Sequence, residues 1–150
     1  MTNTWSTQTR CTCLSLRKAT RRVSQIYDRN LEPHGLTVTQ FSLLGHLNTF
    51  DGISIGTLAD KLAMDPTTLT RNIRPLERKG HLFSSPDVQD GRSRRLHLPA
   101  DGRKAYASAK PAWARAQRQV DKVLDAAGTP NLNALLDGVV ERLAPQVSTQ

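Results

Sequence analysis

Two short helices joined by a tight turn limit what this chain can fold into. Ser54 is a good N-cap for the first helix, because its hydroxyl can accept a hydrogen bond from a free backbone N–H of the first turn. The second helix has Asp65 as its N-cap and Pro66 at the first helical position, where no backbone N–H is needed. Gly80 is expected to end this helix, since glycine readily adopts the left-handed conformation found there. The sequence therefore predicts a helix-turn-helix between residues 54 and 80.

The second helix is predicted to bury one face and to expose the other. Apolar residues recur at Leu69, Ile73 and Leu76, a spacing that places them on one side of a helix. Pro75 removes one backbone donor and is expected to bend or weaken the last turn. The residues expected to face outward are Thr67, Thr68, Thr70, Arg71 and Arg74.

A β-hairpin is predicted directly after this helix. Leu82–Ser85 and Arg94–Leu98 are short strand-like runs, and the dipeptide Asp90-Gly91 between them favours a turn. The return strand alternates apolar and basic residues, as a half-buried strand does. A hairpin that follows a helix-turn-helix is the layout of a winged helix.

Further amphipathic helices are predicted on both sides of this unit. Residues 13–31 and 101–127 carry apolar residues at a helical spacing, and Thr37 and Gln40 have the spacing of a capping box. Thr129-Pro130 is expected to cap a last helix. Its apolar stripe comprises Leu132, Leu135, Leu136, Val139, Val140 and Leu143. Continuous apolar seams on two helices favour burial against a second copy of the chain, and the alternative is a monomer whose long helix folds back on the first.

We therefore expect a mainly α fold with a small β-hairpin wing, in a single domain that spans residues 1–150. A winged helix-turn-helix core would occupy about residues 36–99. The N- and C-terminal helices, about residues 11–32 and 100–146, would form a dimerisation region.

The charge of the chain points to a polyanion. Its 150 residues include 21 Lys and Arg against 13 Asp and Glu, a formal net charge of +8. Residues 10–29 hold six basic and one acidic residue, and residues 71–95 hold seven basic and three acidic ones. Such an excess suggests a nucleic acid as partner, although it can also be a solvated surface.

Other classes of protein fit the sequence poorly. No apolar run reaches the length of a membrane span, and the first ten residues lack the pattern of a signal peptide. Two cysteines are too few for a disulfide-stapled secreted domain. We expect a soluble, cytoplasmic protein that is not an enzyme and needs no cofactor or metal, because no phosphate-binding glycine loop, Ser/His/Asp arrangement or metal-ligand spacing stands out.

The predicted outward residues suit double-stranded DNA. A helix N-terminus offers N–H groups and a positive dipole end to phosphates, and the threonines can bond phosphates or base edges. Arg71 and Arg74 have the reach for bidentate contacts to guanine in the major groove. Arg92 and Arg94 lie at the predicted wing tip, where an arginine suits a narrow minor groove. A winged helix used for protein–protein contact is the alternative to DNA binding.

Four segments of the chain resemble the MarR family of bacterial transcription regulators: Thr57-Leu-Ala-Asp-Lys-Leu62, Asp65-Pro-Thr-Thr-Leu-Thr-Arg71, Leu76-Glu-Arg-Lys-Gly80 and Asp90-Gly-Arg-Ser-Arg-Arg-Leu-His-Leu98. The resemblance implies a homodimer, most simply a repressor, that binds a pseudo-palindromic operator. It also implies that Arg92 enters the minor groove, that Asp90 orients the wing, and that Thr67, Thr68, Arg71 and Arg74 face the major groove. Pro99 departs from the family pattern, in which a threonine often caps the long helix, and Asp101 is expected to take that role.

The resemblance also implies a small effector, often an aromatic or lipophilic anion, bound between the dimerisation helices and the winged helix. The candidate residues for this site are Tyr27, His34, Phe41, Tyr106 and Trp113. Each of them also sits at a helical spacing at which it could simply belong to the core.

Thiol oxidation is the alternative signal. Cys11 and Cys13 stand at the predicted start of the first helix, where basic neighbours and the helix N-terminus favour a thiolate. The run Cys13-Leu-Ser-Leu16 resembles the peroxide-sensing branch of the family. That branch holds its thiol with tyrosines, which Val38 and Phe41 replace here, and no cysteine follows Cys13. A bridge between the two thiols would need unusual geometry, and with His34 they offer too few ligands for a metal.

Overall fold

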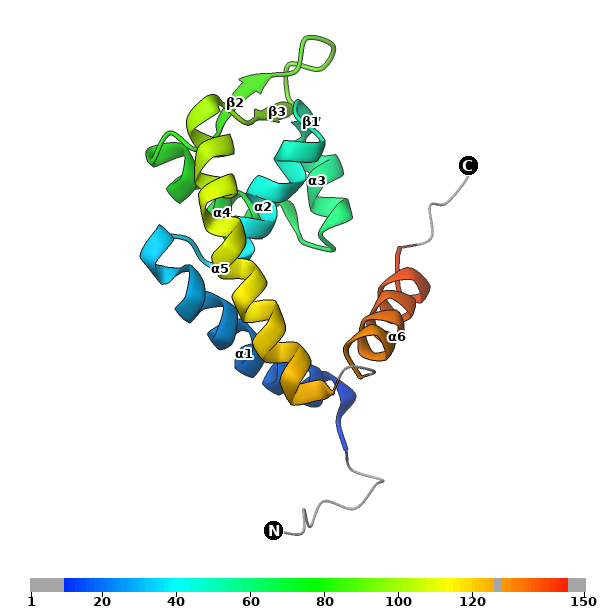
Figure 1. Ribbon diagram of the computed structural model, residues 1–150. Coiled ribbons are helices and arrows are strands. Elements are labelled where there is room, and N and C mark those ends of the chain that lie inside the picture. Colours follow the sequence, from blue (N-terminus) through cyan, green and yellow to red (C-terminus); the bar gives the residue numbers. More distant parts are fainter. Residues whose placement is uncertain (1–9, 126–127, 146–150) are drawn as a thin grey trace.

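The structure is a computed structural model, and it describes residues 10–125 and 128–145. Its elements, in chain order, are α1 (Thr12–Leu31), the 3-10 helix η2 (Glu32–His34), α2 (Val38–Thr49), β1 (Ile53–Ser54), α3 (Ile55–Lys61), α4 (Pro66–Arg78), β2 (Phe83–Pro86), β3 (Arg94–His97), α5 (Ala100–Leu124) and α6 (Gly128–Arg142). Figure 1 shows the sheet at one end of the molecule, with α1 and α5 packed side by side leading away from it. The expected fold class, mainly α with a hairpin wing, is confirmed.

The predicted caps form as local hydrogen bonds. The Ser54 side chain accepts the N–H of Thr57 at 3.1 Å, and the Asp65 carboxylate accepts the N–H of Thr68 at 2.9 Å. Thr37 begins α2 with the expected capping box. Gly80 follows α4 with a φ of +74° and donates to the carbonyl of Glu77, which ends the helix as expected.

The tight turn between α3 and α4 is at Ala63-Met64-Asp65, as predicted, and it closes on a left-handed residue that was not predicted. Ala63 has a φ of +48°, in the left-handed region where a side chain is strained. Its N–H donates to the carbonyl of Asp60, and the next N–H, that of Met64, donates to the carbonyl of Ala59. These two bonds satisfy the free carbonyls at the end of α3 and turn the chain sharply into α4.

The sheet has three antiparallel strands in the order β1-β3-β2. The hairpin of β2 and β3 confirms the sequence prediction, with Ser84 opposite Leu96. Strand β1 was not predicted, because two residues are too few to show an alternating pattern. It pairs Ile53 with Leu96 and so ties the end of α2 to the wing.

Two predicted helix starts are wrong. Asp101 does not cap α5: the helix begins at Ala100, after Pro99, because the N–H of Arg103 already bonds the Pro99 carbonyl. Asp101 therefore falls inside the first turn. Likewise, α6 begins at Gly128, so Thr129-Pro130 lies within the helix rather than at its cap. The predicted end of the long helix at residue 127 lies outside the described residues, which show α5 to Leu124.

The hydrophobic core lies mainly inside the winged helix, between α2, α3, α4 and the sheet. Leu69, Ile73 and Leu76 of α4 are at most 3% exposed, which confirms the predicted inner face of that helix. Pro75 stands inside α4, which continues to Arg78.

The apolar stripe of α6, by contrast, is exposed to solvent: Leu135 is 71% exposed and Leu143 is 78% exposed. Figure 1 shows α6 standing apart from the winged helix. In the part of the chain that the structure describes, no helix is both long and apolar enough to cross a membrane.

A glycine allows α5 to dock directly beneath the end of α4. Gly102, in the first turn of α5, is buried, and a Cβ at this position would overlap the carbonyl oxygen of His81. The same Cβ would lie 2.6 Å from the Leu98 side chain. Because His81 directly follows Gly80, the long helix rests on the backbone that ends α4.

Gly102→Ala should therefore destabilise the protein by about 1–3 kcal/mol, the usual cost of forcing extra atoms into a packed core. The free energy of unfolding, measured by urea titration, tests this. Gly56→Ala on α3 is the matched control, because a Cβ at Gly56 meets nothing within 4 Å. The control should be neutral or slightly stabilising. Equal effects of the two substitutions would contradict a backbone contact at Gly102.

Candidate nucleic-acid interface

The outer face of α4 carries exposed cationic side chains. Arg71 and Arg74 are exposed on this face, and Thr67 is exposed in the first turn. The buried leucines and isoleucine on the opposite side fix the rotation of the helix, so these three residues face solvent together. The structure thus brings the two predicted base-reading arginines to one surface.

The other two predicted threonines are engaged within the helix. The Thr68 hydroxyl donates to the Asp65 carboxylate, and the Thr70 hydroxyl donates to the Pro66 carbonyl at 2.8 Å. The hydroxyl and the N–H of Thr68 together lower the pKa of Asp65 below its ordinary value. Asp65 is therefore ionised near neutral pH and occupies one of the free N–H groups at the start of α4. In this arrangement Thr68 and Thr70 stabilise the helix start rather than offering a free hydroxyl donor.

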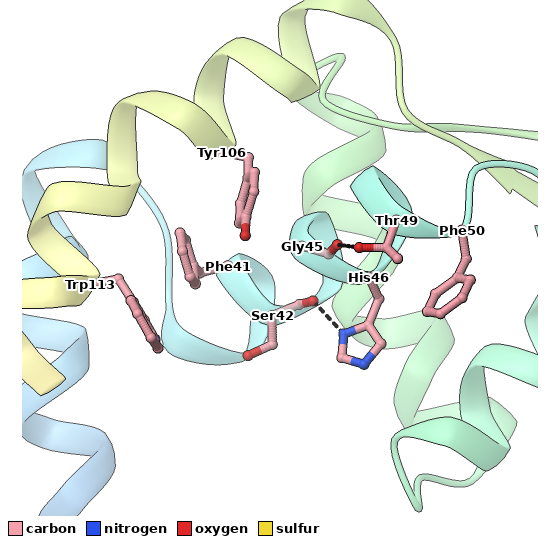
Figure 2. Close-up of a pocket in the computed structure, with 8 residues that line it drawn as sticks. All are labelled: Phe41, Ser42, Gly45, His46, Thr49, Phe50, Tyr106 and Trp113. Atoms are coloured by element: carbon pink, nitrogen blue, oxygen red, sulfur yellow. Dashed lines mark hydrogen bonds between the residues drawn. The ribbon is translucent and has the colours of Figure 1, made fainter.

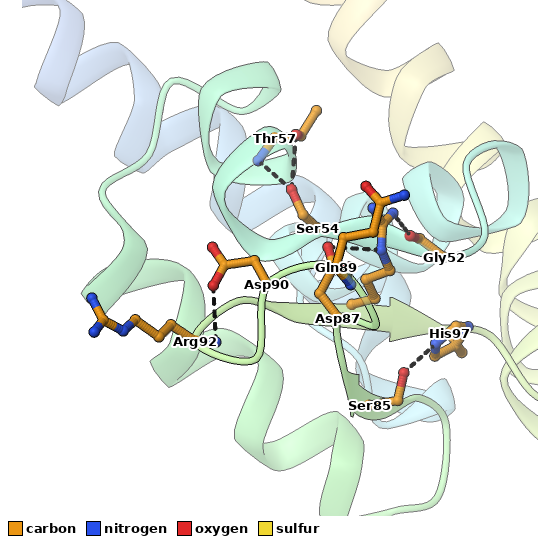
Figure 3. Close-up of polar contacts among 10 residues, drawn as sticks. Gly52, Ser54, Thr57, Ser85, Asp87, Gln89, Asp90, Arg92 and His97 are labelled. Carbon is orange, nitrogen blue, oxygen red and sulfur yellow. Dashed lines mark hydrogen bonds and ion pairs between the residues drawn. The ribbon is translucent and has the colours of Figure 1, made fainter.

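The wing turn is shaped by Asp90. Its carboxylate accepts the N–H of Arg92 at 3.1 Å, and its carbonyl accepts the N–H of Ser93 at 2.9 Å. Figure 3 shows the Arg92 side chain extending away from the hairpin. The family resemblance implied that Asp90 orients the wing and that Arg92 extends from its tip. In the structure Asp90 holds the turn through these two bonds, and the Arg92 side chain points away from it.

The next two arginines of the wing are held by the protein. Arg94 donates through Nε and Nη2 to the Ser84 hydroxyl, at 3.0 Å and 2.9 Å. Arg95 forms an ion pair with Asp87 at 3.0 Å and also donates to the carbonyl of Gly52 at 2.7 Å. The pKa of Asp87 is lowered, first by the N–H of Gln89 and then by Arg95. Arg94, which was expected to contact DNA, thus lies against β2 in this structure.

A second polar cluster fastens the base of the wing. The Ser85 hydroxyl lies 2.8 Å from Nε2 of His97, and the Phe83 ring stacks on that imidazole with centroids 4.9 Å apart. Nδ1 of His97 is 3.9 Å from Asp51, too far for a hydrogen bond, and the Asp51 carboxylate instead accepts the N–H of Leu98 at 2.8 Å. Sequence reasoning missed this cluster because its members come from three separate segments. Figure 3 shows the contact between Ser85 and His97, which joins the two strands of the hairpin, and the bond from Leu98 to Asp51 adds the segment that follows α2.

A pocket of about 300 Å³ opens between α2 and α5 (Figure 2). Three of the five predicted effector residues line it, namely Phe41, Tyr106 and Trp113. The Phe41 ring lies 4.9 Å from that of Tyr106 and 5.8 Å from that of Trp113, between centroids. The residues that sequence reasoning missed are Ser42, Gly45, His46, Thr49 and Phe50. Their spacing along one face of α2 was the available signal.

The other two predicted effector residues do not line this pocket. The Tyr27 ring lies 6.5 Å from that of Trp113, and its hydroxyl donates to Gln117 on α5. Burial, with a smaller contribution from Asp121, raises the pKa of Tyr27. His34 lies on η2, where Nδ1 is 3.5 Å from the Ser108 hydroxyl. Tyr27 therefore supports the wall behind Trp113, and His34 is placed elsewhere.

The two cysteines are free and exposed at the start of α1. Cys11 is the N-cap residue, with extended backbone, and Cys13 lies in the first turn. Among residues 10–125 and 128–145, no three His, Cys, Asp or Glu side chains are grouped so that they could hold a metal ion.

Comparison with known proteins fits this geometry. The sequence model of the MarR family matches residues 36–93. The fold matches that of the M. tuberculosis transcriptional regulator MosR, solved in complex with DNA, with a TM-score of 0.80 and 32% identity, over 89% of this chain and 96% of that one. This chain belongs to the MarR family. The family match covers the winged helix, and the structural match extends the MarR-family fold to the flanking helices.

Curated transcription regulators match over shorter stretches. The transcriptional activatory protein BadR of Rhodopseudomonas palustris is 37% identical over 81 residues, which are 52% of this chain and 46% of BadR. The transcriptional regulator SarZ of Staphylococcus haemolyticus is 28% identical over 90 residues, which are 60% of this chain and 61% of SarZ. The chain thus spans about half the length of the curated relatives it matches.

Proposed function

We propose that this MarR-family chain is a cytoplasmic, dimeric transcription regulator that binds a pseudo-palindromic DNA operator. One observation carries the proposal: α4 presents Arg71 and Arg74 on its solvent face, and the wing beside it extends Arg92. A helix of this kind fits the major groove, while an extended arginine fits the minor groove. Support also comes from MosR, which was solved bound to DNA and is 32% identical.

The helices outside the winged helix would hold two copies together. Leu135 and Leu143 on α6 and Val123 on α5 are at least 71% exposed in a single chain, and such a patch favours a partner. In a two-fold dimer the same apolar patch of each copy would cover that of the other. The two α4 helices would then lie against successive major grooves, about 34 Å apart. In this arrangement residues 36–99 read DNA and the terminal helices form the dimer.

We expect the regulator to repress, by occupying its operator until a signal releases it. The name of BadR describes an activator, so the sign of the effect is measured directly, by transcription from an operator-bearing promoter with and without the protein. Lower transcription in its presence supports repression, and higher transcription contradicts it.

The first candidate signal is a small aromatic anion bound between α2 and α5. The pocket there is lined by four Phe, Tyr or Trp rings and has a volume of about 300 Å³, which suits a small aromatic molecule. Because the pocket spans the first helix of the winged unit and the long dimerisation helix, an occupant could alter the angle between them.

The second candidate signal is oxidation of Cys11 and Cys13. Both thiols are exposed, and the extended backbone of Cys11 places it outside the helix that holds Cys13. Hydrogen peroxide would convert one thiolate to a sulfenic acid and release hydroxide, which becomes water on taking up a proton. A second thiol would then displace the sulfenic hydroxyl as water to form a disulfide between copies.

The DNA contacts are tested on α4 first. Arg71→Ala or Arg74→Ala should relax base preference at one operator position by about 1–3 kcal/mol, because a bidentate guanine contact is lost. Operator sequences are obtained by selecting bound fragments from genomic DNA, and affinities are then measured on the operator, its single-base variants and random duplex. Arg142→Ala, an exposed arginine on α6, is the control with the same change of charge.

Two results would overturn these assignments. If Arg71→Ala and Arg74→Ala weakened specific and random duplexes equally, the arginines would contact phosphates alone. In the same titration Arg92→Ala should weaken binding most where the operator flanks are A·T-rich. Unchanged affinity on those flanks would remove the minor-groove role of Arg92.

The dimer is tested by placing a charge on α6. Leu135 is 71% exposed in one chain, so Leu135→Asp should leave the protomer folded but separate the two copies. Sedimentation should show a dimer of the 16.6 kDa wild-type chain and a monomer of the variant, with much weaker operator binding. Asn133→Asp, an exposed polar position on the same helix, should remain dimeric. A monomeric wild type at micromolar concentration would contradict the dimer.

The two signals are separated by release of the protein from its operator. A panel of aromatic carboxylates should release the wild type and Cys13→Ser but not Ser42→Leu, whose side chain fills the pocket. Peroxide should release the wild type and Ser42→Leu but not Cys13→Ser, if the thiols are the sensor. Fluorescence anisotropy of labelled operator reports both. Release by peroxide that persists in Cys13→Ser excludes the thiol mechanism, and release by carboxylates that persists in Ser42→Leu excludes this pocket.

A further inference from the structure

The solvent face of α1 carries an interrupted row of cationic side chains. Four of them lie on two successive turns and the fifth follows on the same face two turns later, and all of them are exposed: Arg17, Lys18, Arg21, Arg22 and Arg29. We call this row the α1 basic stripe. Twelve residues separate its ends, so it extends for about 18 Å along the helix. The opposite face of α1, with Tyr27 and the buried Leu31, packs against the rest of the protein.

No acidic group of the described residues neutralises the α1 basic stripe. In the described part of the chain the ion pair of Arg95 with Asp87 lies in the wing, and the approach of His97 to Asp51, at 3.9 Å, likewise involves no residue of α1. The single carboxylate of α1, that of Asp28, accepts the N–H of Val38 at 2.8 Å and so caps α2. The sequence of residues 1–9, just before α1, contains no Asp or Glu. The stripe is therefore an uncompensated row of five positive charges.

The stripe itself is not suited to a contact with the partner's copy, although α1 belongs to the proposed dimerisation region. The large apolar side chains exposed on α1, Leu14 and Leu16, precede the stripe, and those of α6 lie on another helix. Two copies of the stripe would repel each other if they met. In Figure 1 the N-terminal half of α1, which includes Arg17, Lys18 and Arg21, lies at the opposite end of the molecule from the wing.

The chemistry of the row favours the phosphates of a nucleic acid duplex. Four of its five members are arginine, whose planar fork matches phosphate oxygens in pairs. A stripe of about 18 Å can follow several successive phosphates of one strand. A membrane surface fits less well, because a helix that lies on lipid inserts a long apolar face, and α1 exposes large apolar side chains only at Leu14 and Leu16, while Tyr27 and Leu31 are packed on the rest of the protein.

We propose that the α1 basic stripe is a second, sequence-independent DNA-binding surface, which holds a duplex segment other than the operator. The proposal rests on the proposed function, in which α4 and the wing hold the operator. Each dimer would then carry its reading helices on one side and phosphate-binding stripes on another, and could bring two segments of DNA together.

Capture of a second duplex tests the proposal on the full-length protein. Operator duplex is fixed to beads and saturated with protein, and a fluorescent duplex of random sequence is added at low salt. The wild type should retain the fluorescent duplex, and retention should fall steeply as salt rises. Arg17→Gln/Arg21→Gln/Arg22→Gln should lower the retained fraction at least tenfold, while affinity for the bead-bound operator changes less than threefold.

The matched control removes three charges elsewhere. Lys104, Lys122 and Arg142 are exposed on α5 and α6, and their replacement by glutamine gives the same net charge as the stripe variant. This control should retain the second duplex like the wild type. The proposal is overturned if the wild type captures no second duplex, or if the stripe variant and the control behave alike. It is equally overturned if anionic phosphatidylserine vesicles or a polyglutamate peptide bind the stripe while duplex DNA does not.

Failure of the proposed function would look different. Arg71→Ala/Arg74→Ala/Arg92→Ala should lose operator preference but keep a residual, salt-sensitive affinity for any duplex, which the further loss of the stripe arginines removes. If α4 and the wing did not bind DNA, these three changes would alter nothing and only the stripe variant would matter. If the stripe did not bind DNA, the residual affinity would be the same with and without it.

Discussion

The close contact between α5 and the backbone that ends α4 is the constraint on which the rest of the structure depends. Gly102 is buried against the carbonyl of His81, and a side chain there would overlap main-chain atoms. Main chain cannot rotate aside as a flexible side chain can, so α5 and the end of α4 have one position relative to each other. The helix proposed to face DNA and the helix that leads to α6 therefore move as a unit or separate at this contact.

Two further contacts connect α4 and α2 to α1 and to the segment that follows it. Lys79, the residue that ends α4, donates to the carbonyl of Gly35 between α1 and α2. Asp28 on α1 caps α2 through the N–H of Val38. The aromatic pocket lies within this frame, with Phe41 from α2 and Trp113 from α5 on its walls. A molecule that enters it would press on elements already connected to α4, which is how a small ligand could alter the DNA-facing surface.

Sequence predicted most of what local chemistry decides. The caps at Ser54 and Asp65 and the turn at Gly80 depend on residues a few positions apart, so the sequence could reveal them. The left-handed conformation of Ala63 in the predicted turn was not foreseen, because two backbone bonds impose it and not the residue's own preference. The placement of Arg94 was missed because its partner, Ser84, is in register only after the hairpin forms. Residue type could suggest which arginines contact DNA, but strand pairing determined that Arg94 and Arg95 bind other protein groups and that the Arg92 side chain extends from the wing.

The distribution of charge shows the same difference between composition and structure. Helix α1 carries five basic residues and one acidic residue, and α5 carries six basic and two acidic ones, so the two helices together account for the whole formal charge of +8. The rest of the chain is neutral as a sum. The surface proposed to face DNA nevertheless exposes Arg71, Arg74 and Arg92, while the nearby acids make other contacts: Asp65 caps α4, Asp87 pairs with Arg95, and Asp90 binds the wing backbone. Net charge alone would therefore assign the polyanion site to α1 and α5, whereas the positions of the carboxylates leave cationic surface on the winged helix as well.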